Sequence, residues 1–207
     1  MAPVLVGVTG GSASGKSRIA ERLIEAFPGR SCAILSQDHF FRDWTGRDHL
    51  RTANRPDSVL WPALLDAVDA IVGGGAAGLP VAGTRASARR LEPWRVEARD
   101  LLVIEGLFAL WDDELRARYD LTVYVDAPDD ERVLRRMNRD IAERGANLEG
   151  ATAWYRHDVL NSFPRYTLPA RWQADLVIPN PTTAAEPRGV RALLAAVREL
   201  VHERASS

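Results

Sequence analysis

The chain has 207 residues, of which 46% are hydrophobic and 27% charged, enough for one sizeable buried core. This balance excludes disordered, collagen-like and disulfide-scaffold proteins. The 27 basic and 28 acidic residues give a formal net charge of −1, so we expect neither nucleic acid nor a membrane surface as partner. Cys32 is the only cysteine, which excludes an intrachain disulfide and a cysteine-rich zinc site. Since the sequence contains no signal-peptide pattern and no apolar run of about 18 residues, we expect a cytoplasmic protein.

The basic residues are distributed unusually between Arg and Lys. Of the 27, 26 are Arg and only Lys16 is Lys. Because Arg is favoured almost everywhere else, this single Lys indicates a position that needs a compact ammonium group. A planar guanidinium would not serve there.

Five short apolar runs are typical of strands that are buried on both faces of a sheet. They are Val4–Val8, Cys32–Leu35, Leu101–Ile104, Leu121–Val125 and Leu176–Ile178. Helical periodicity predicts helices that start near Lys16, cover about residues 60–71 and cover about residues 193–201. This alternation predicts an α/β fold of three αβα layers, with a five-stranded parallel sheet in the middle.

Two further segments complete the predicted organisation. Gly73–Gly78 is predicted to form a flexible turn after the second helix, and residues 79–96 a small hairpin insertion around the sequence TRASARR. No repeat, low-complexity tract or convincing linker divides the chain. We therefore predict a single domain over residues 1–207.

The segment Gly10–Ser17 reads GGSASGKS and fits the phosphate-loop pattern G-x-x-x-x-G-K-[ST] between a strand and a helix. Its glycines let the backbone wrap a phosphate, and the helix N-terminus adds partial positive charge. Lys16 is expected to reach the β- and γ-phosphates, and the Ser17 hydroxyl to bind Mg²⁺. The chain is thus predicted to be a P-loop NTPase with ATP and Mg²⁺ as cofactors, and the residues predicted to bind ATP are Gly11, Ser12, Ala13, Ser14, Gly15, Lys16 and Ser17.

Two carboxylates lie at the carboxyl ends of predicted strands, where open α/β sheets form their ligand crevice. Glu105 is expected to bind magnesium directly or through water. Asp38 could take the proton of a substrate hydroxyl that attacks the γ-phosphoryl group, or help hold magnesium. We interpret the neighbouring His39 as a surface or helix-start residue. A GTPase is not indicated, because neither D-x-x-G nor a properly ordered N-K-x-D motif is present.

Residues 128–146 are predicted to form a helical segment. At about 100° per residue, four arginines share one sector of the helix and four apolar residues the opposite side. We expect the apolar side to pack, and the guanidinium side to neutralise charge on a transferring phosphoryl group. The arginines are Arg132, Arg135, Arg136 and Arg139, and the apolar residues are Val133, Leu134, Met137 and Ile141.

These motifs resemble the uridine kinase and phosphoribulokinase branch of P-loop kinases, and uridine–cytidine kinases most closely. The resemblance runs from Val4 to about Asn180 and depends on GGSASGKS, SQDHFF, RPDSV, VIEG, VDAPDDERVLRRMNRDIAERG and ADLVIPN. It implies that Asp38 is the catalytic base and that Asp57 binds the ribose. It further implies that residues 128–146 form a helical lid, with Arg136, Arg139 and Arg144 over the phosphates. The resemblance is also the only indication of a homo-oligomer.

The substrate-binding positions depart from the family pattern. Uridine–cytidine kinases hold the pyrimidine with the Tyr and His of V-Y-D-x-x-x-H-S-R, where this chain has Ala82 and Ser87. Phe41 replaces a Tyr, Arg55 replaces a His, and Ala146 replaces the second Arg after E-R-G. The resemblance therefore implies an ATP-dependent kinase of a small-molecule hydroxyl, first of all the 5′-OH of a nucleoside. The residues expected to contact the acceptor are Asp38, Phe41, Asp57, Arg89 and Arg136.

Other functions remain open from the sequence. SQDHFF also resembles nicotinamide riboside kinases, so that riboside is an alternative acceptor. A non-nucleoside alcohol, such as a sugar or a pantothenate-like compound, is another, and Arg85 and Arg89 would then indicate an acidic acceptor. A non-catalytic regulator would instead bind ATP without releasing ADP in response to any acceptor.

Overall fold

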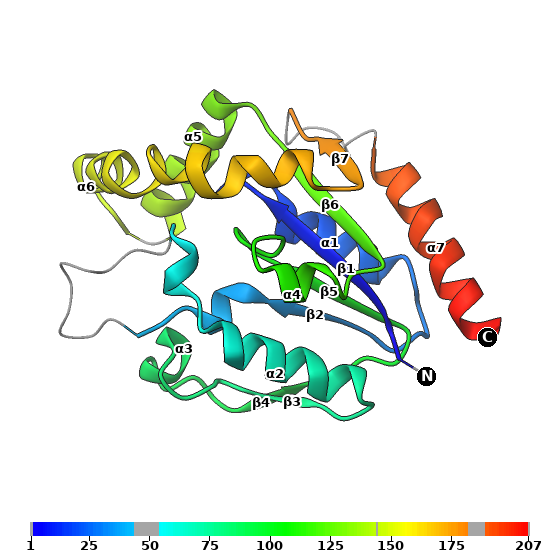
Figure 1. Cartoon of the computed structure of the whole chain (residues 1–207). Coiled ribbons are helices and arrows are strands. Elements are labelled where there is room, and N and C mark those ends of the chain that lie inside the picture. The colour runs from blue at the N-terminus through cyan, green and yellow to red at the C-terminus, as the bar shows by residue number, and fades with distance from the viewer. Residues whose placement is uncertain (1, 44–53, 144, 182–188, 207) are drawn as a thin grey trace.

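A five-stranded parallel sheet forms the centre of the computed structural model, which describes residues 2–43, 54–143, 145–181 and 189–206 (Figure 1). The strand order is β2-β5-β1-β6-β7. All five predicted strands are confirmed, and each extends one or two residues beyond its apolar run at the carboxyl end. Their bounds are β1 (Val4–Gly10), β2 (Cys32–Ser36), β5 (Leu101–Glu105), β6 (Leu121–Asp126) and β7 (Leu176–Pro179).

The strand sequences are nearly unbroken apolar runs because helices cover both faces of the sheet. In β1, Val4, Val6 and Val8 belong to one core cluster, whereas Leu5 belongs to the other. In β5, Leu102 likewise packs on the same side as Leu5. This alternation follows from the two-residue period of a strand.

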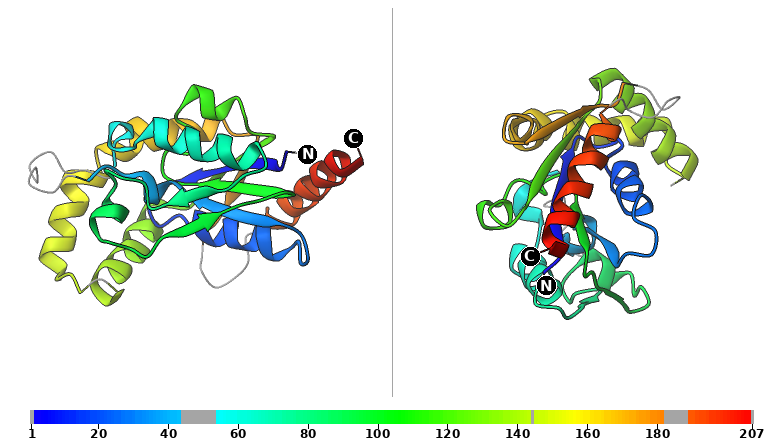
Figure 2. Two further views of the ribbon diagram at one scale, coloured as in Figure 1. Left: turned by 90° about the horizontal axis from the view of Figure 1, so that it is seen from below. Right: turned by 90° about the vertical axis from the view of Figure 1, so that its right-hand side faces the viewer.

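Helices cover both faces of the sheet, as predicted (Figure 2). The helices α1 (Lys16–Glu25) and α7 (Val190–Ser206) bury Leu23, Leu193 and other apolar residues against the face of Val4, Val6 and Val8. Helix α2 (Trp61–Val72) buries Leu64 and Ile71 on the opposite face. Within the described residues, no helix is long and apolar enough to cross a bilayer.

The predicted hairpin is present, but its bounds and its turn differ from the prediction. Strands β3 (Ala77–Leu79) and β4 (Trp94–Val96) pair antiparallel, with Ala77 opposite Val96. The strand begins inside the segment predicted as a flexible turn because Ala77 and Leu79 are buried against α2. The TRASARR sequence forms a short helix, α3 (Arg85–Ala88), because the Thr84 hydroxyl caps it by accepting a hydrogen bond from the Ser87 amide at 3.2 Å.

The predicted lid stands at the carboxyl end of the sheet, opposite the two chain termini (Figure 1). Its helix α5 (Asp129–Asn138) continues as a π-helix over Arg139–Glu143. The remaining elements are α4 (Asp113–Arg116), α6 (Leu148–Trp154), π-helical turns at Tyr155–Val159 and Phe163–Thr167, and 3₁₀ turns at Gln37–Phe40, Pro56–Ser58 and Leu168–Trp172.

The predicted orientation of the lid helix is wrong. Its arginine side is the one that packs inward, and Arg132 and Arg136 are buried. On the predicted packing side, Leu134 is 62% exposed and Ile141 39% exposed. The physical reason is that α5 faces the polar phosphate loop instead of an apolar surface: Arg136 donates a hydrogen bond of 2.7 Å to the Ser12 hydroxyl.

Candidate active site

The phosphate loop joins β1 to α1 through a tight turn. The Ser14 amide donates to the Gly11 carbonyl at 3.0 Å, and Gly15 adopts the left-handed conformation with φ of 94°. A residue with a side chain would be strained at that position. From the end of β7, the Asn180 side chain donates to the Ser14 carbonyl at 2.7 Å. This turn places the amino-terminal end of α1, with its unpaired amides, at the loop, as anion binding requires.

Glu105 lies beside the loop and is held by two hydroxyl groups. The Ser17 hydroxyl donates to one carboxylate oxygen at 3.1 Å, and the Ser36 hydroxyl donates to the other at 2.5 Å. Glu105 is buried, whereas Ser17 is exposed. A carboxylate and a hydroxyl next to Lys16 are oxygen ligands of the kind that Mg²⁺ prefers, so the donor set fits magnesium. The sequence interpretation missed Ser36, although it stands in the SQD motif.

The chain after Glu105 is fixed by buried polar contacts. The Gln37 side-chain oxygen accepts a hydrogen bond from the Phe108 amide at 2.9 Å. The Thr9 hydroxyl lies 3.0 Å from the carbonyls of both Gly106 and Leu107 and donates to them. A Cβ atom on Gly106 would lie 2.5 Å from the Cβ of Gln37, so a larger residue would displace this turn. These contacts orient Glu105 toward the phosphate loop.

A cleft of about 410 Å³ opens next to the loop. Seven predicted site residues line it together: Ser12, Lys16, Asp38, Phe41, Arg89, Arg136 and Arg139. The other residues that line it are Asn54, Arg85, Leu107 and Trp154. Among these lining residues, five are cationic and only Asp38 is anionic, which favours an anionic ligand.

Asp38 reaches the cleft from the 3₁₀ turn that follows β2. The turn is capped by Ser36, whose hydroxyl accepts a hydrogen bond from the Asp38 amide at 3.4 Å, so the Asp38 carboxylate is not needed as a cap. The Asp38 side chain is exposed and lines the cleft. His39 instead packs edge-on against Trp94, with ring centroids 4.9 Å apart, and burial lowers the pKa of its imidazole. It is therefore neutral near pH 7.

The lid arginines take different roles. Arg136 contacts Ser12 of the loop and forms a buried ion pair with Asp140, and Arg139 also lines the cleft. Arg135 is directed elsewhere, to the Glu131 carboxylate at 2.9 Å and to the carbonyl of Asn180 at 3.2 Å. Arg144, predicted to contact the phosphates, lies outside the described residues.

Arg132 connects the lid to the loop, a contact that the sequence did not indicate. Its side chain is 2% exposed, and its guanidinium lies 3.7 Å from the centroid of the Phe163 ring. A Cβ atom added to Gly11 would lie 2.9 Å from the Arg132 Cζ atom. Of the Arg132 nitrogens, Nε and one terminal nitrogen have no hydrogen-bond partner among the described residues. Arg132 thus covers Gly11 and leaves room there only for glycine.

Comparison with known proteins agrees with this geometry. A profile of the Phosphoribulokinase / Uridine kinase family matches residues 5–185. The chain belongs to this family. It is 33% identical over 183 residues to a uridine kinase of Clostridium novyi, covering 86% of this chain and 88% of that protein. It is 34% identical over 182 residues to a uridine kinase of Deinococcus deserti, with coverage of 86% and 88%. The solved structure of phosphoribulokinase from Rhodobacter spheroides has a TM-score of 0.62 at 18% identity and covers 86% of this chain and 70% of that one.

The chain is accordingly an ATP-dependent kinase that phosphorylates a small-molecule hydroxyl. In this kinase the predicted ribose ligand, Asp57, is not brought into the cleft: its side chain is 67% exposed and pairs with Arg55 at 3.4 Å. Asn54 lines the cleft instead, is 6% exposed and is hydrogen-bonded to the buried Asp158. Asp57 lies in the 3₁₀ turn Pro56–Ser58, whose other two residues, Pro56 and Ser58, are buried.

Two further differences lie on the acceptor side of the kinase cleft. Ala82 and Ser87, which replace the Tyr and His of the uridine–cytidine kinase pattern, are not among the residues that line it. Trp154, at the end of α6, lines it and was not predicted. Its position follows only from the path of the chain after the lid, which no local motif of the sequence encodes.

Proposed function

We propose that this kinase transfers the γ-phosphoryl group of ATP to the 5′-OH of a nucleoside. The observation that carries the proposal is the placement of one carboxylate, Asp38, in the same cleft as Lys16 and two lid arginines, Arg136 and Arg139. The relatives described above are uridine kinases, which supports a nucleoside as acceptor. A kinase depends on a supply of ATP, and we propose the cytoplasm as its location.

In this proposal the phosphate loop binds ATP. The phosphates are held by the backbone from Gly11 to Ser17 and by the Lys16 ammonium group. Arg144 is proposed as a further phosphate contact, as the sequence predicts. Ser17 and Glu105 would hold Mg²⁺, which neutralises phosphate charge when it is bound. Because Glu105 is anchored on Ser36 and on the end of β5, it needs little reorganisation to act as a ligand.

The acceptor hydroxyl lies between Asp38 and the γ-phosphoryl group. Asp38 accepts the proton as the hydroxyl oxygen bonds to phosphorus, and the bond from phosphorus to the bridging oxygen of ADP breaks. Arg136 and Arg139 neutralise the charge on the transferring group, and the lid excludes water that would otherwise hydrolyse ATP. Phe41, Asn54 and Arg89 contact the rest of the acceptor in this arrangement.

The change Asp38→Asn tests the assignment of the base. An amide cannot accept the proton, so we expect kcat to fall by about 10²- to 10⁴-fold, whereas the affinity for ATP stays within a few-fold. Acceptor-stimulated ADP release measures kcat, and isothermal titration calorimetry measures the affinity for ATP.

Asp130→Asn is the matched control, because Asp130 is exposed near the start of α5 and is not among the residues that line the cleft. We expect this variant to leave both kcat and the affinity for ATP unchanged. Near-normal turnover of the Asp38→Asn protein would show that the base is wrongly assigned. ATP binding without ADP release for any acceptor would instead favour a non-catalytic regulator.

A further inference from the structure

Most of the residues that line the cleft are polar or charged, which suits phosphates and a sugar better than a flat base. Three of the described lining residues have apolar side chains: Phe41, Leu107 and Trp154. An aromatic base is bound mainly through its flat faces, against which aromatic side chains stack. These three residues are therefore the candidates to hold the base of a nucleoside.

Two of the three have no flat face open to a ligand. The Phe41 ring belongs to the buried core and is only 2% exposed, and the Arg85 guanidinium lies over it, 4.7 Å from the ring centroid. Leu107 is half-buried, packs against the same core and has no ring. Both can border the base, but neither offers a surface on which it could stack.

Trp154 differs from both in its surroundings. It ends helix α6, is 36% exposed and belongs to none of the buried apolar clusters that the described residues form. Its nearest aromatic neighbour among the described residues is His157, with ring centroids 6.5 Å apart and tilted by 36°, too far apart for close stacking. A large indole that lines a polar cleft outside the core leaves apolar surface for a ligand.

The position of Trp154 puts this surface on the lid side of the cleft. Helix α6 packs beside the lid helix α5, whereas the hairpin helix α3 lies elsewhere on the molecule (Figure 1). The uridine–cytidine kinase pattern holds the pyrimidine from the hairpin, through a Tyr and a His. Here the replacements, Ala82 and Ser87, are not among the residues that line the cleft. The hairpin thus supplies no ring for the base, and α6 supplies one.

Given the proposed function, on which this step depends, we infer that the base of the acceptor nucleoside stacks on the Trp154 indole. The base is then held from the lid side of the cleft and not from the hairpin. Stacking recognises a flat ring, which every base has, and does not need a particular set of hydrogen-bonding groups. Nucleoside binding can therefore persist in a chain that has neither the Tyr nor the His of the family pattern.

The change Trp154→Leu tests this inference, because Leu keeps an apolar side chain and removes the flat surface. The full chain with ATP and Mg²⁺ is offered uridine, cytidine, adenosine, nicotinamide riboside, D-glycerate and pantothenate, and ADP release is measured. For the best riboside we expect KM to rise by about 10- to 100-fold, and kcat to stay within about threefold. Trp154→Phe keeps an aromatic face, so we expect its KM within about fivefold of the native value.

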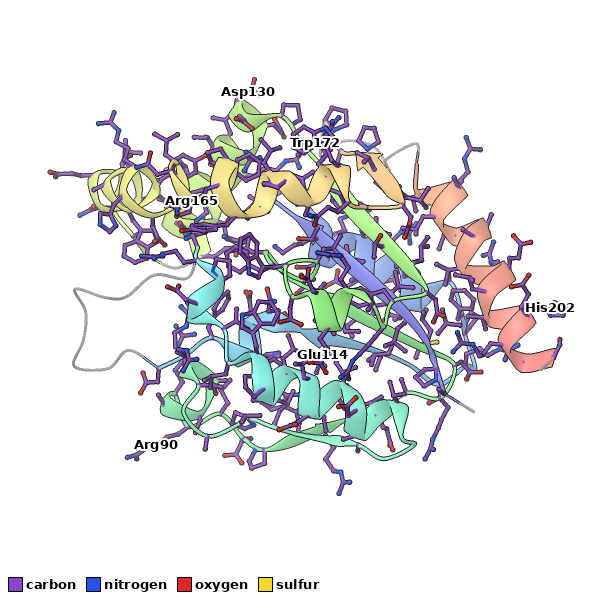
Figure 3. The ribbon with its side chains drawn as sticks, viewed as in Figure 1. Arg90, Glu114, Asp130, Arg165, Trp172 and His202 are labelled. Atoms are coloured by element: carbon purple, nitrogen blue, oxygen red, sulfur yellow. The ribbon has the colours of Figure 1, made fainter. Side chains whose placement is uncertain are left out.

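Trp172→Leu is the matched control. Trp172 is 70% exposed, is not among the residues that line the cleft and lies on the turn that leads into β7 (Figure 3). We expect its KM and kcat to equal those of the native chain. Tryptophan fluorescence gives a second readout that needs no turnover: the best riboside, added with ADP, should change the emission of the native and Trp172→Leu proteins but not that of Trp154→Phe.

The outcomes separate this inference from the proposed function. Riboside turnover with an unchanged KM in Trp154→Leu, or an equal rise in Trp172→Leu, would overturn the stacking and leave the nucleoside kinase intact. A fall in kcat at unchanged KM would show that Trp154 acts on the lid, which also overturns the stacking alone. Turnover of D-glycerate or pantothenate and of no riboside would overturn the nucleoside in both proposals. If ATP bound but no acceptor released ADP, both would be overturned together.

Discussion

The contact between Arg132 and Gly11 shows how single residues set the distance between lid and loop. The guanidinium lies over Gly11 and against the Phe163 ring, and all three come from separate segments of the chain. The backbone of Gly11 is not in the left-handed region, so its conformation does not require glycine. Glycine is needed because there is no room for a Cβ atom. The lid can lie this close to the phosphate loop only because this position has no side chain.

Gly11→Ala should therefore destabilise the protein by steric overlap. A Cβ atom there would lie 2.9 Å from atoms of both Arg132 and Phe163, and we expect a loss of about 1–3 kcal/mol in the free energy of unfolding, measured in urea. Gly78→Ala is the control, because a Cβ atom on Gly78 has no heavy atom within 4 Å. Equal losses for the two variants would contradict this account.

Residues that act within a local motif could be predicted from the sequence, and residues that the fold brings in from elsewhere could not. Lys16 and Ser17 belong to one motif, Glu105 ends an apolar strand and Asp38 follows shortly after another, so spacing alone indicates where they lie. Asn54 and Trp154 reach the same cleft along paths that no periodicity encodes. Asp57 matches a motif, but its exposed side chain pairs with Arg55 and is not among the residues that line the cleft.

Among the elements, the lid helix shows a limit of hydrophobic periodicity. The pattern correctly separated the two sides of α5, but it assumed that the apolar side packs. Here the neighbour is a polar loop, so guanidiniums with hydrogen bonds and ring contacts form the packed side, and Leu134 faces solvent. A periodic pattern identifies two faces, and only the neighbouring element decides which of them is buried.

This arrangement predicts a contrast between two neighbouring arginines of α5. Arg136 contacts Ser12 and lines the cleft, whereas Arg135 contacts Glu131 and the Asn180 carbonyl. We expect Arg136→Gln to lower kcat by about 10²- to 10³-fold, the usual effect of removing one group that stabilises transition-state charge. Arg135→Gln should stay within a few-fold in the same ADP-release assay. If both variants lost activity equally, the lid would act through its stability and not through Arg136.

At the scale of the whole molecule, the strand order creates the site. Strand β1 lies between β5 and β6, so the phosphate loop leaves the sheet directly beside the end of β5, where Glu105 is. Strand β2 pairs with β5 on its other edge and brings Ser36 and Asp38 to the same end. The sequence predicted which segments are strands, because burial on both faces makes them apolar. It could not predict their order, which depends on how the crossovers pack.

Ligand binding at this end of the sheet should stabilise the whole chain. At about 100 times its dissociation constant, ATP with Mg²⁺ adds about 2.7 kcal/mol to the free energy of unfolding. For a chain of this size that corresponds to an increase in Tm of about 5–10 °C in a thermal scan. Lys16→Ala should remove most of this increase and leave the Tm of the unliganded protein nearly unchanged. The same increase in both proteins would show that ATP binds elsewhere.

The single Lys makes the phosphate loop chemically distinguishable from the rest of the molecule. Apart from the amino terminus, Lys16 carries the only primary amine of the chain, and it lines the cleft. A reagent that acylates amines can therefore add at most one group to a side chain of this protein. The mass of the intact chain would then show whether Lys16 has been acylated, and hence whether a bound nucleotide shields the loop. This measurement needs neither an engineered label nor a known acceptor.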